Sequence, residues 1–205
     1  MVKVSHIVNS VFSSRTYIIS CDKKTDFWLV DCGDIPPLVD SLSLLGNGSF
    51  IVKGVLLTHA HYDHMYGLPE LKQLFPEIKI YTNEFGKSAL ANERMNFSRY
   101  HEDPINYKSE NVIICDEGSK IELFESVFAK VYYTPGHNPS CLTYEVDDYL
   151  FTGDAFIPGV AVVTTLKGGD KKQAVESVAK IQDLARGKII FPGHEVTGSS
   201  NDCYR

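Results

Sequence analysis

Thr58-His59-Ala60-His61-Tyr62-Asp63-His64 places four side chains that can bind metal within six residues, directly after the apolar run 55–57. Side chains two positions apart on an extended segment point to the same side, so His59 and His61 are expected to face the same way. Imidazole nitrogens and carboxylate oxygens are ligands that zinc and iron accept. The stretch therefore predicts a metal site at the end of a strand.

Three further segments end a strand-like run in the same manner. In each, β-branched or aromatic residues stop at a glycine turn, and a histidine or an aspartate follows at once. These segments are 131–137, 149–154 and 188–194. Of the seven histidines in the chain, only His6 and His101 lie outside the four clusters. We therefore expect four strand ends to bring seven ligands to one open edge, where a rigid sheet positions the side chains.

The order of these residues resembles the metallo-β-lactamase superfamily and, within it, the glyoxalase II-like hydrolases. The turns Thr134-Pro135-Gly136, Thr152-Gly153 and Phe191-Pro192-Gly193 fit that branch, and the matches run from Asp31 to His194. The resemblance implies an α/β fold, a four-layer αββα sandwich with a two-metal site at one edge. We expect residues 1–205 to form a single domain of this type.

The resemblance also implies a ligand set for two divalent metal ions. The residues concerned are His59, His61 and His137 for the first ion, Asp63, His64 and His194 for the second, and Asp154 between them. We expect zinc, with iron or manganese as alternatives. Asp31 matches an aspartate of the family that supports the ligand loop, although an acid that ends a strand at a turn explains it equally well.

Two such cations lower the pKa of a bridging water molecule and polarise a carbonyl or phosphoryl oxygen. We therefore expect hydrolysis of an ester, a thioester or a related carbonyl bond of a small molecule, with Asp63, His64 and Asp154 as catalytic residues; Asp63 would also orient the nucleophile. The alternative is a mononuclear-iron enzyme that oxidises glutathione persulfide. A β-lactamase, a nuclease or phosphodiesterase, and a metal-binding module without turnover also stay open.

The sequence departs from the resembled branch at two places. True glyoxalase II enzymes carry a further basic helical domain that binds glutathione, and the eleven residues after His194 leave no room for it. After His137 the family often continues with Thr and then Gly-His, whereas this chain reads Asn138-Pro139-Ser140-Cys141. Both departures count against specificity for glutathione thioesters, although the enzyme is still expected to resemble the hydroxyacylglutathione hydrolases.

Composition limits the partners. With 205 residues, 43% of them hydrophobic, the chain can bury a substantial core. The net charge is −6 and the lysines and arginines are scattered, which disfavours a nucleic-acid partner. A 20-residue apolar span and an export signal are both absent from the sequence, so we expect no membrane contact and a cytoplasmic location. Five cysteines without a C-x-x-C pair favour reduced, packed thiols.

The segment 84–107 begins as a helix and then becomes polar and aromatic, which suggests a cover over the metal edge. Arg94, Arg99 and Tyr100 in this segment, and Lys167 in a later glycine-rich loop, are the candidate substrate contacts. A solvated loop whose arginines pair with carboxylates elsewhere is the alternative interpretation.

Periodicity predicts the remaining elements. Strands are expected at 2–8, 16–20, 27–30, 51–57 and 79–82, the first three as an antiparallel meander. Helices are expected from Pro36 to about Leu45, from Leu68 to Phe75, and over 170–186 with Asp170 as the N-cap.

Overall fold

The first half of the chain builds a six-stranded sheet that changes from antiparallel to parallel pairing. The computed structural model describes residues 1–22 and 25–194. The antiparallel strands are β1 (Val2–Val8), β2 (Arg15–Cys21) and β3 (Asp26–Val30). The strands that follow in parallel are β4 (Ile51–Leu56), β5 (Lys79–Thr82) and β6 (Val112–Ile114). The predicted meander is confirmed.

Parallel neighbours require crossover connections, and helices supply them. The crossovers contain α1 (Ile35–Leu45), then α2 (Tyr62–Met65) and α3 (Leu68–Leu74), and finally α4 (Glu84–Leu90) with the short 3₁₀ helix η1 (Ser98–Tyr100). A proline in the first turn of α1 and Gly46 at its end give that helix the expected boundaries.

The second half of the chain builds a five-stranded sheet. Its antiparallel strands are β7 (Lys120–Phe124), β8 (Val127–Tyr133), β9 (Leu142–Val146) and β10 (Tyr149–Gly153). Then α5 (Lys171–Leu184) crosses over, and β11 (Ile189–Pro192) pairs in parallel with β10. The side chain of Asp170 accepts a hydrogen bond from the Gln173 N–H at 2.9 Å, which confirms the predicted N-cap.

Alternation along the strands explains why the sheets stack. On β3, Phe27 and Leu29 face one hydrophobic cluster while Trp28 and Val30 face another, because successive strand side chains point to opposite faces. The first cluster also contains Leu38 and other residues of the helices that cover the first sheet. The second cluster lies between the sheets.

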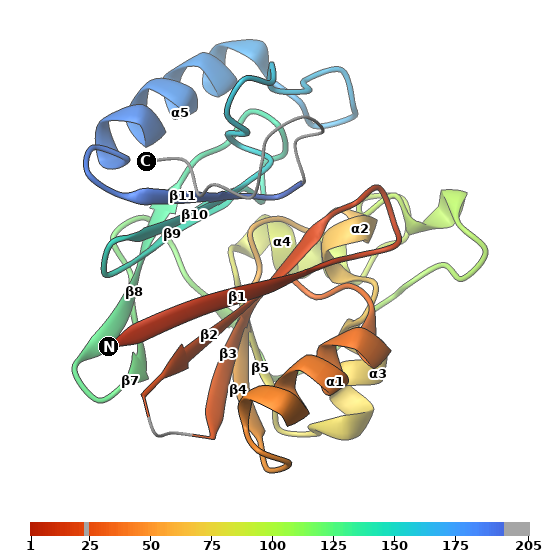
Figure 1. The fold of residues 1–205 in the computed structure, drawn as a ribbon. Helices are drawn as coiled ribbons and strands as arrows, with labels where there is room; N and C mark the ends of the chain where they lie inside the picture. The colour runs from red at the N-terminus through yellow and green to blue at the C-terminus, as the bar shows by residue number, and fades with distance from the viewer. Residues whose placement is uncertain (23–24, 195–205) are drawn as a thin grey trace.

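The interior is therefore arranged in layers. The cluster between the sheets joins residues of both halves of the chain, among them Tyr17, Leu56, Tyr144 and Phe151. A third, smaller cluster packs Leu150 and neighbours against Ile181 of α5. Figure 1 shows α5 over the outer face of the second sheet and α1 and α3 over the outer face of the first. The predicted αββα sandwich is confirmed.

Local differences from the sequence expectations concern short elements. The periodic pattern does not mark α2, which has four residues, or β6, which has three, because such elements are too short to show a repeat. The strands β7 and β9 are likewise additions to the expected set. Among the described residues no helix combines the length and hydrophobicity needed to cross a bilayer.

Candidate metal centre

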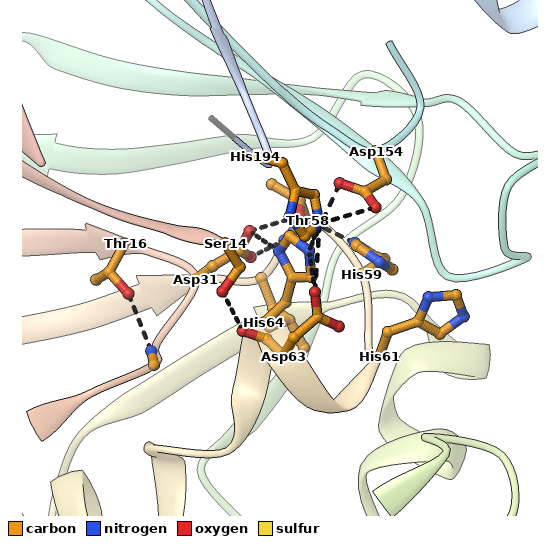
Figure 2. A network of polar contacts seen from close by, with 12 residues as sticks. Ser14, Thr16, Asp31, Thr58, His59, His61, Asp63, His64, Asp154 and His194 are labelled. Carbon is orange, nitrogen blue, oxygen red and sulfur yellow. Dashed lines mark hydrogen bonds and ion pairs between the residues drawn. The ribbon is translucent and has the colours of Figure 1, made fainter. Parts of the chain in front are cut away.

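The candidate ligands come from four neighbouring strand ends. His59 and His61 lie in the loop after β4, and Asp63 and His64 lie in the short helix α2 that this loop enters. The other three, His137, Asp154 and His194, follow β8, β10 and β11 respectively. Figure 2 shows the side chains of Asp63, His64, Asp154 and His194 directed toward one another, with His59 beside them.

The convergence of ligand atoms is close enough for metal coordination. Three groups have ligand atoms that all lie within 4.8 Å of one another: His59, His61 and His137; His59, His64 and Asp154; and Asp63, His64 and His194. The first and third groups match the two ligand sets implied by the resemblance. The cluster therefore offers two adjoining places for a cation.

The Asp154 carboxylate lies between these two places. Its Oδ2 atom is 3.6 Å from His137 Nε2 on one side and 3.2 Å from His194 Nε2 on the other, and its Oδ1 atom is 3.5 Å from His64 Nε2. A carboxylate can bind through both of its oxygens. Asp154 is thus positioned to contact cations in both places.

Four of the five histidines direct Nε2 toward the cluster and hold a hydrogen on Nδ1. The Nδ1 atoms of His137, His194 and His64 donate to oxygens that can only accept: Val163 O at 2.8 Å, Phe12 O at 2.9 Å and Asp31 Oδ2 at 2.8 Å. In His59, Nδ1 lies 3.2 Å from Thr58 Oγ1, whose hydrogen goes to Asp31. A hydrogen held on Nδ1 leaves Nε2 with a free lone pair, which is the form a metal requires.

Asp31 organises the ligand loop from beneath. Besides His64 Nδ1, it accepts hydrogen bonds from Thr58 N and Thr58 Oγ1, both at 2.7 Å. The residue is buried and has a positive φ of 60°. This strained backbone conformation directs the carboxylate toward the ligand loop. A single residue therefore fixes both the start of the ligand segment and the orientation of the His64 ring.

The donor set fits a metal because it leaves buried polar atoms without partners. Among the described residues, His59 Nε2 and Asp154 Oδ1 are buried and have no hydrogen-bond partner. Such atoms carry a desolvation cost unless something satisfies them. Imidazole nitrogen and carboxylate oxygen together match zinc or iron, so a cation of this kind would satisfy both atoms at once.

The backbone leaves space for these ligands at Gly193. A Cβ atom on this residue would stand 2.1 Å from Asp154 Oδ1 and 2.9 Å from His64 Cε1. Gly153, with φ of 51°, likewise has no room for a Cβ atom, because the Thr58 side chain lies against it. Glycine is therefore required where the second sheet approaches the ligand loop.

Charge in the cluster holds its acids ionised. Burial opposes ionisation of Asp63, but the neighbouring His64 and His194 outweigh it and keep the pKa of Asp63 well below its usual range. Burial lowers the pKa of His194, yet hydrogen bonds to Asp154 and Asp63 outweigh burial and raise that pKa to about 10. In the absence of a cation, protons therefore supply the positive charge that the carboxylates require.

The loop between β1 and β2 also supports the centre, although its residue types do not indicate this. Ser14 Oγ donates to the backbone oxygen of Asp63 at 2.7 Å, and Phe12 O accepts from His194. Arg15 N, at the start of β2, donates to Gly193 O at 2.8 Å. Two of these three contacts are made by backbone atoms, which the residue type does not reveal.

The four candidate substrate contacts lie on the surface. Arg94, Arg99, Tyr100 and Lys167 are all exposed, and the Arg99 guanidinium lies 5.7 Å from the centroid of the Tyr100 ring. The segment 84–107 reaches the cluster through Phe97, whose ring centroid is 4.9 Å from that of His61. Phe97 is absent from the predicted contacts, and its left-handed backbone (φ of 63°) is what turns the chain there.

The cysteines take no part in the cluster as the structure describes it. Cys32, Cys115 and Cys141 are buried and Cys21 is partly buried, all without disulfides, whereas Cys203 lies outside the described residues. Burial raises the pKa of the Cys141 thiol far above its ordinary value. Cys141 is therefore a packed, unreactive thiol.

Fold and site together define a class of protein: an αββα sandwich with a histidine and aspartate metal-binding cluster where its two sheets meet. The family model described as the metallo-beta-lactamase superfamily matches residues 11–194. The chain belongs to the metallo-β-lactamase superfamily, in agreement with its motifs.

The chain is also similar to curated hydroxyacylglutathione hydrolases. The hydroxyacylglutathione hydrolase of Vibrio parahaemolyticus serotype O3:K6 is 30% identical over 172 residues, which are 84% of this chain and 58% of the relative. The chain thus spans less than two thirds of that relative.

Solved structures share the fold. A B3 metallo-beta-lactamase, BLEG-1, superimposes with a TM-score of 0.83 at 24% identity, covering 95% of this chain and 92% of its own. TTHA1623 in a di-iron-bound form gives a TM-score of 0.76 at 22% identity, covering 94% and 92%. At these identities the likeness concerns the fold alone.

Proposed function

We propose that this chain is a hydrolase with two zinc ions, which cleaves an ester, a thioester or a related carbonyl bond of a small molecule. The observation that carries the proposal is a pair of buried atoms without hydrogen-bond partners, His59 Nε2 and Asp154 Oδ1, inside a cluster of seven convergent ligands. The names of the curated relatives support the reaction type.

The residues would divide between two ions. His59, His61 and His137 would hold the first, and Asp63, His64 and His194 the second, with Asp154 contacting both. Two divalent ions supply a water molecule of lowered pKa and polarise a carbonyl oxygen. Zinc fits a set dominated by imidazole, although iron and manganese accept the same donors.

Protein groups at the centre would orient the reactants. The low pKa of Asp63 keeps this side chain ionised at neutral pH, so it accepts hydrogen bonds and is suited to orient the hydrogens of an attacking water molecule. Asp154 and His64 lie within 3.5 Å of each other and complete the catalytic set. Phe97 covers one side of His61 and limits access of solvent from that side.

Substrate contacts are proposed at the exposed residues beside this cover. These residues are Arg94, Arg99 and Tyr100, in the same segment as Phe97, and Lys167, in the loop before α5. A small molecule with a polar tail fits such contacts, and we infer no nucleic-acid or membrane partner. The unpaired cysteines of the described residues agree with a cytoplasmic location.

Metal content is the measurement that tests the proposal. Protein purified without added metal should contain two zinc ions per chain by elemental analysis and should hydrolyse members of a panel of generic esters, thioesters and lactones. Asp154→Asn should lose zinc and turnover together, because one of its carboxylate oxygens becomes an amide nitrogen that cannot bind a cation.

Two results would overturn it. One iron per chain with sulfite formed from glutathione persulfide would select the dioxygenase alternative. Full zinc content and full turnover in Asp154→Asn would remove the bridging role.

A further inference from the structure

The hydrogen-bonding partner of His61 differs in kind from those of the other four histidines. The ring nitrogen that points away from the cluster is Nε2, and it lies 2.8 Å from Asn138 Nδ2. An amide nitrogen can only donate. His61 Nε2 must therefore accept, whereas the outward nitrogens of the other four rings donate to oxygens.

The orientation of the Asn138 amide is fixed by its neighbours. Asn138 Oδ1 accepts from Ser140 N at 2.9 Å and from Ser140 Oγ at 2.6 Å. The Ser140 hydroxyl oxygen in turn accepts from Ala60 N at 3.0 Å, so its hydrogen is directed to Asn138. Turning the amide over would set its NH₂ group against the Ser140 N–H, two donors face to face, in a fully buried place.

The hydrogen of the neutral His61 ring is consequently on Nδ1. That atom lies 3.0 Å from His137 Nε2, which has a free lone pair because His137 Nδ1 donates to Val163 O. Asn138, His61, His137 and Val163 thus form a chain of three hydrogen bonds, each with one donor and one acceptor. The chain satisfies these groups without a cation, and it occupies both Nδ1 of His61 and Nε2 of His137.

We propose that Asn138 is a positioning residue that disfavours the metal-binding form of His61 and so weakens the first metal position. To present a lone pair on Nδ1, a neutral His61 must carry its hydrogen on Nε2, where it meets the Asn138 NH₂ group. The second position has no such conflict, because Asp31 and Phe12 O accept from His64 and His194. This inference rests on the proposed two-metal centre.

The test compares two substitutions that remove the amide NH₂ group and leave an oxygen that can accept. Asn138→Asp keeps the bonds to Ser140 and offers His61 a carboxylate oxygen. Asn138→Thr offers a hydroxyl oxygen without adding charge. Asn111→Asp, at a partly exposed asparagine that contacts none of the candidate ligands, adds the same charge elsewhere and serves as the control.

Histidine ring nitrogens would be followed by NMR in ¹⁵N-histidine-labelled protein, first metal-free and then during titration with zinc. Metal-free wild-type protein should show the His61 hydrogen on Nδ1, and both Asn138 variants should show it on Nε2. The zinc-binding step that shifts the His61 signals should tighten about tenfold in both variants, the lower end of the range for outer ligand partners. The affinity of the other zinc-binding step should be unchanged in both Asn138 variants, and both steps should keep wild-type affinity in Asn111→Asp.

The outcomes separate the two proposals. A wild-type His61 with its hydrogen on Nε2, or unaltered zinc affinity in both Asn138 variants, would overturn the role of Asn138. If tightening occurred in Asn138→Asp alone, added charge would be its cause, and the proposal would fail as well. A wild-type protein that binds no zinc would instead overturn the two-metal centre. The wild-type spectrum decides the tautomer even if the variants do not fold.

Discussion

Replacing Asp31 with asparagine should weaken binding of the proposed second metal ion while leaving the fold intact. If the amide oxygen keeps the hydrogen bond from Thr58 N, the amide nitrogen takes the place of Oδ2 and faces His64 Nδ1. Two donors then oppose each other, and the His64 hydrogen is driven to Nε2, the atom that faces the cluster. The ligand is present but presents the wrong nitrogen.

The magnitude follows from the partners that Asp31 holds. Loss of an outer partner of a histidine ligand costs about 10- to 100-fold in metal affinity, and each tenfold corresponds to about 1.4 kcal/mol. The hydroxyl of Thr58 also loses its carboxylate acceptor, which should lower the free energy of unfolding by about 1 to 3 kcal/mol. This loss of about 1 to 3 kcal/mol is smaller than the stability of a typical domain, about 5 to 15 kcal/mol, so the metal-free variant should fold.

The assay is a zinc titration against a chromogenic chelator, together with urea unfolding of the metal-free protein. Asp34→Asn is a matched control, because Asp34 accepts from Ser10 N, Ser10 Oγ and Tyr66 Oη but contacts none of the candidate ligands. It should lower stability and leave zinc affinity unchanged. Wild-type affinity for both zinc ions in a folded Asp31→Asn protein would refute the reasoning.

Other perturbations test the centre from different sides. Gly193→Ala should reduce zinc content measured by elemental analysis, since its Cβ would stand 2.1 Å from Asp154 Oδ1; full content would contradict the packing argument. The pKa of His194 is raised to about 10, so the metal-free protein holds a proton that the unfolded chain loses near pH 6.5. Its stability should therefore fall as pH rises from about 6.5 to about 10, and a flat urea midpoint would count against the raised pKa. Zinc at about 1,000 times its dissociation constant should stabilise the fold by about 4 kcal/mol, and a chelator should remove that gain. Arg99→Ala should raise KM for the eventual substrate, and an unchanged KM would exclude Arg99 as a contact.

The sequence predicted those parts of the centre that depend on local chemistry. The ligand segment from His59 to His64 could be recognised because the residue types and their spacing are themselves the requirement. The same holds for His137, Asp154 and His194, since each follows a strand with a recognisable apolar pattern and a glycine turn. The layered fold followed from the resemblance that these motifs carry.

The supporting contacts could not be predicted, because they depend on atoms that the residue type does not specify. Phe12 contributes a backbone oxygen, which every residue has. Asn138 was visible as a departure from the family pattern, but its effect depends on which way its amide turns, and Ser140 N decides that in three dimensions. Phe97 reaches His61 only because its φ is 63°, a conformation that sequence rarely indicates for phenylalanine.

The cluster joins the two halves of the sandwich. His59, His61, Asp63 and His64 extend from the first sheet, and the remaining three ligands extend from the second. Leu142 N and Tyr144 Oη already tie the second sheet to the backbone oxygens of Thr58 and Leu57. Cations bound between the two sheets would crosslink them, so that separation of the sheets and release of the metal become one event. Slower amide hydrogen exchange in the strands beside the cluster would then measure the fraction of protein with metal bound.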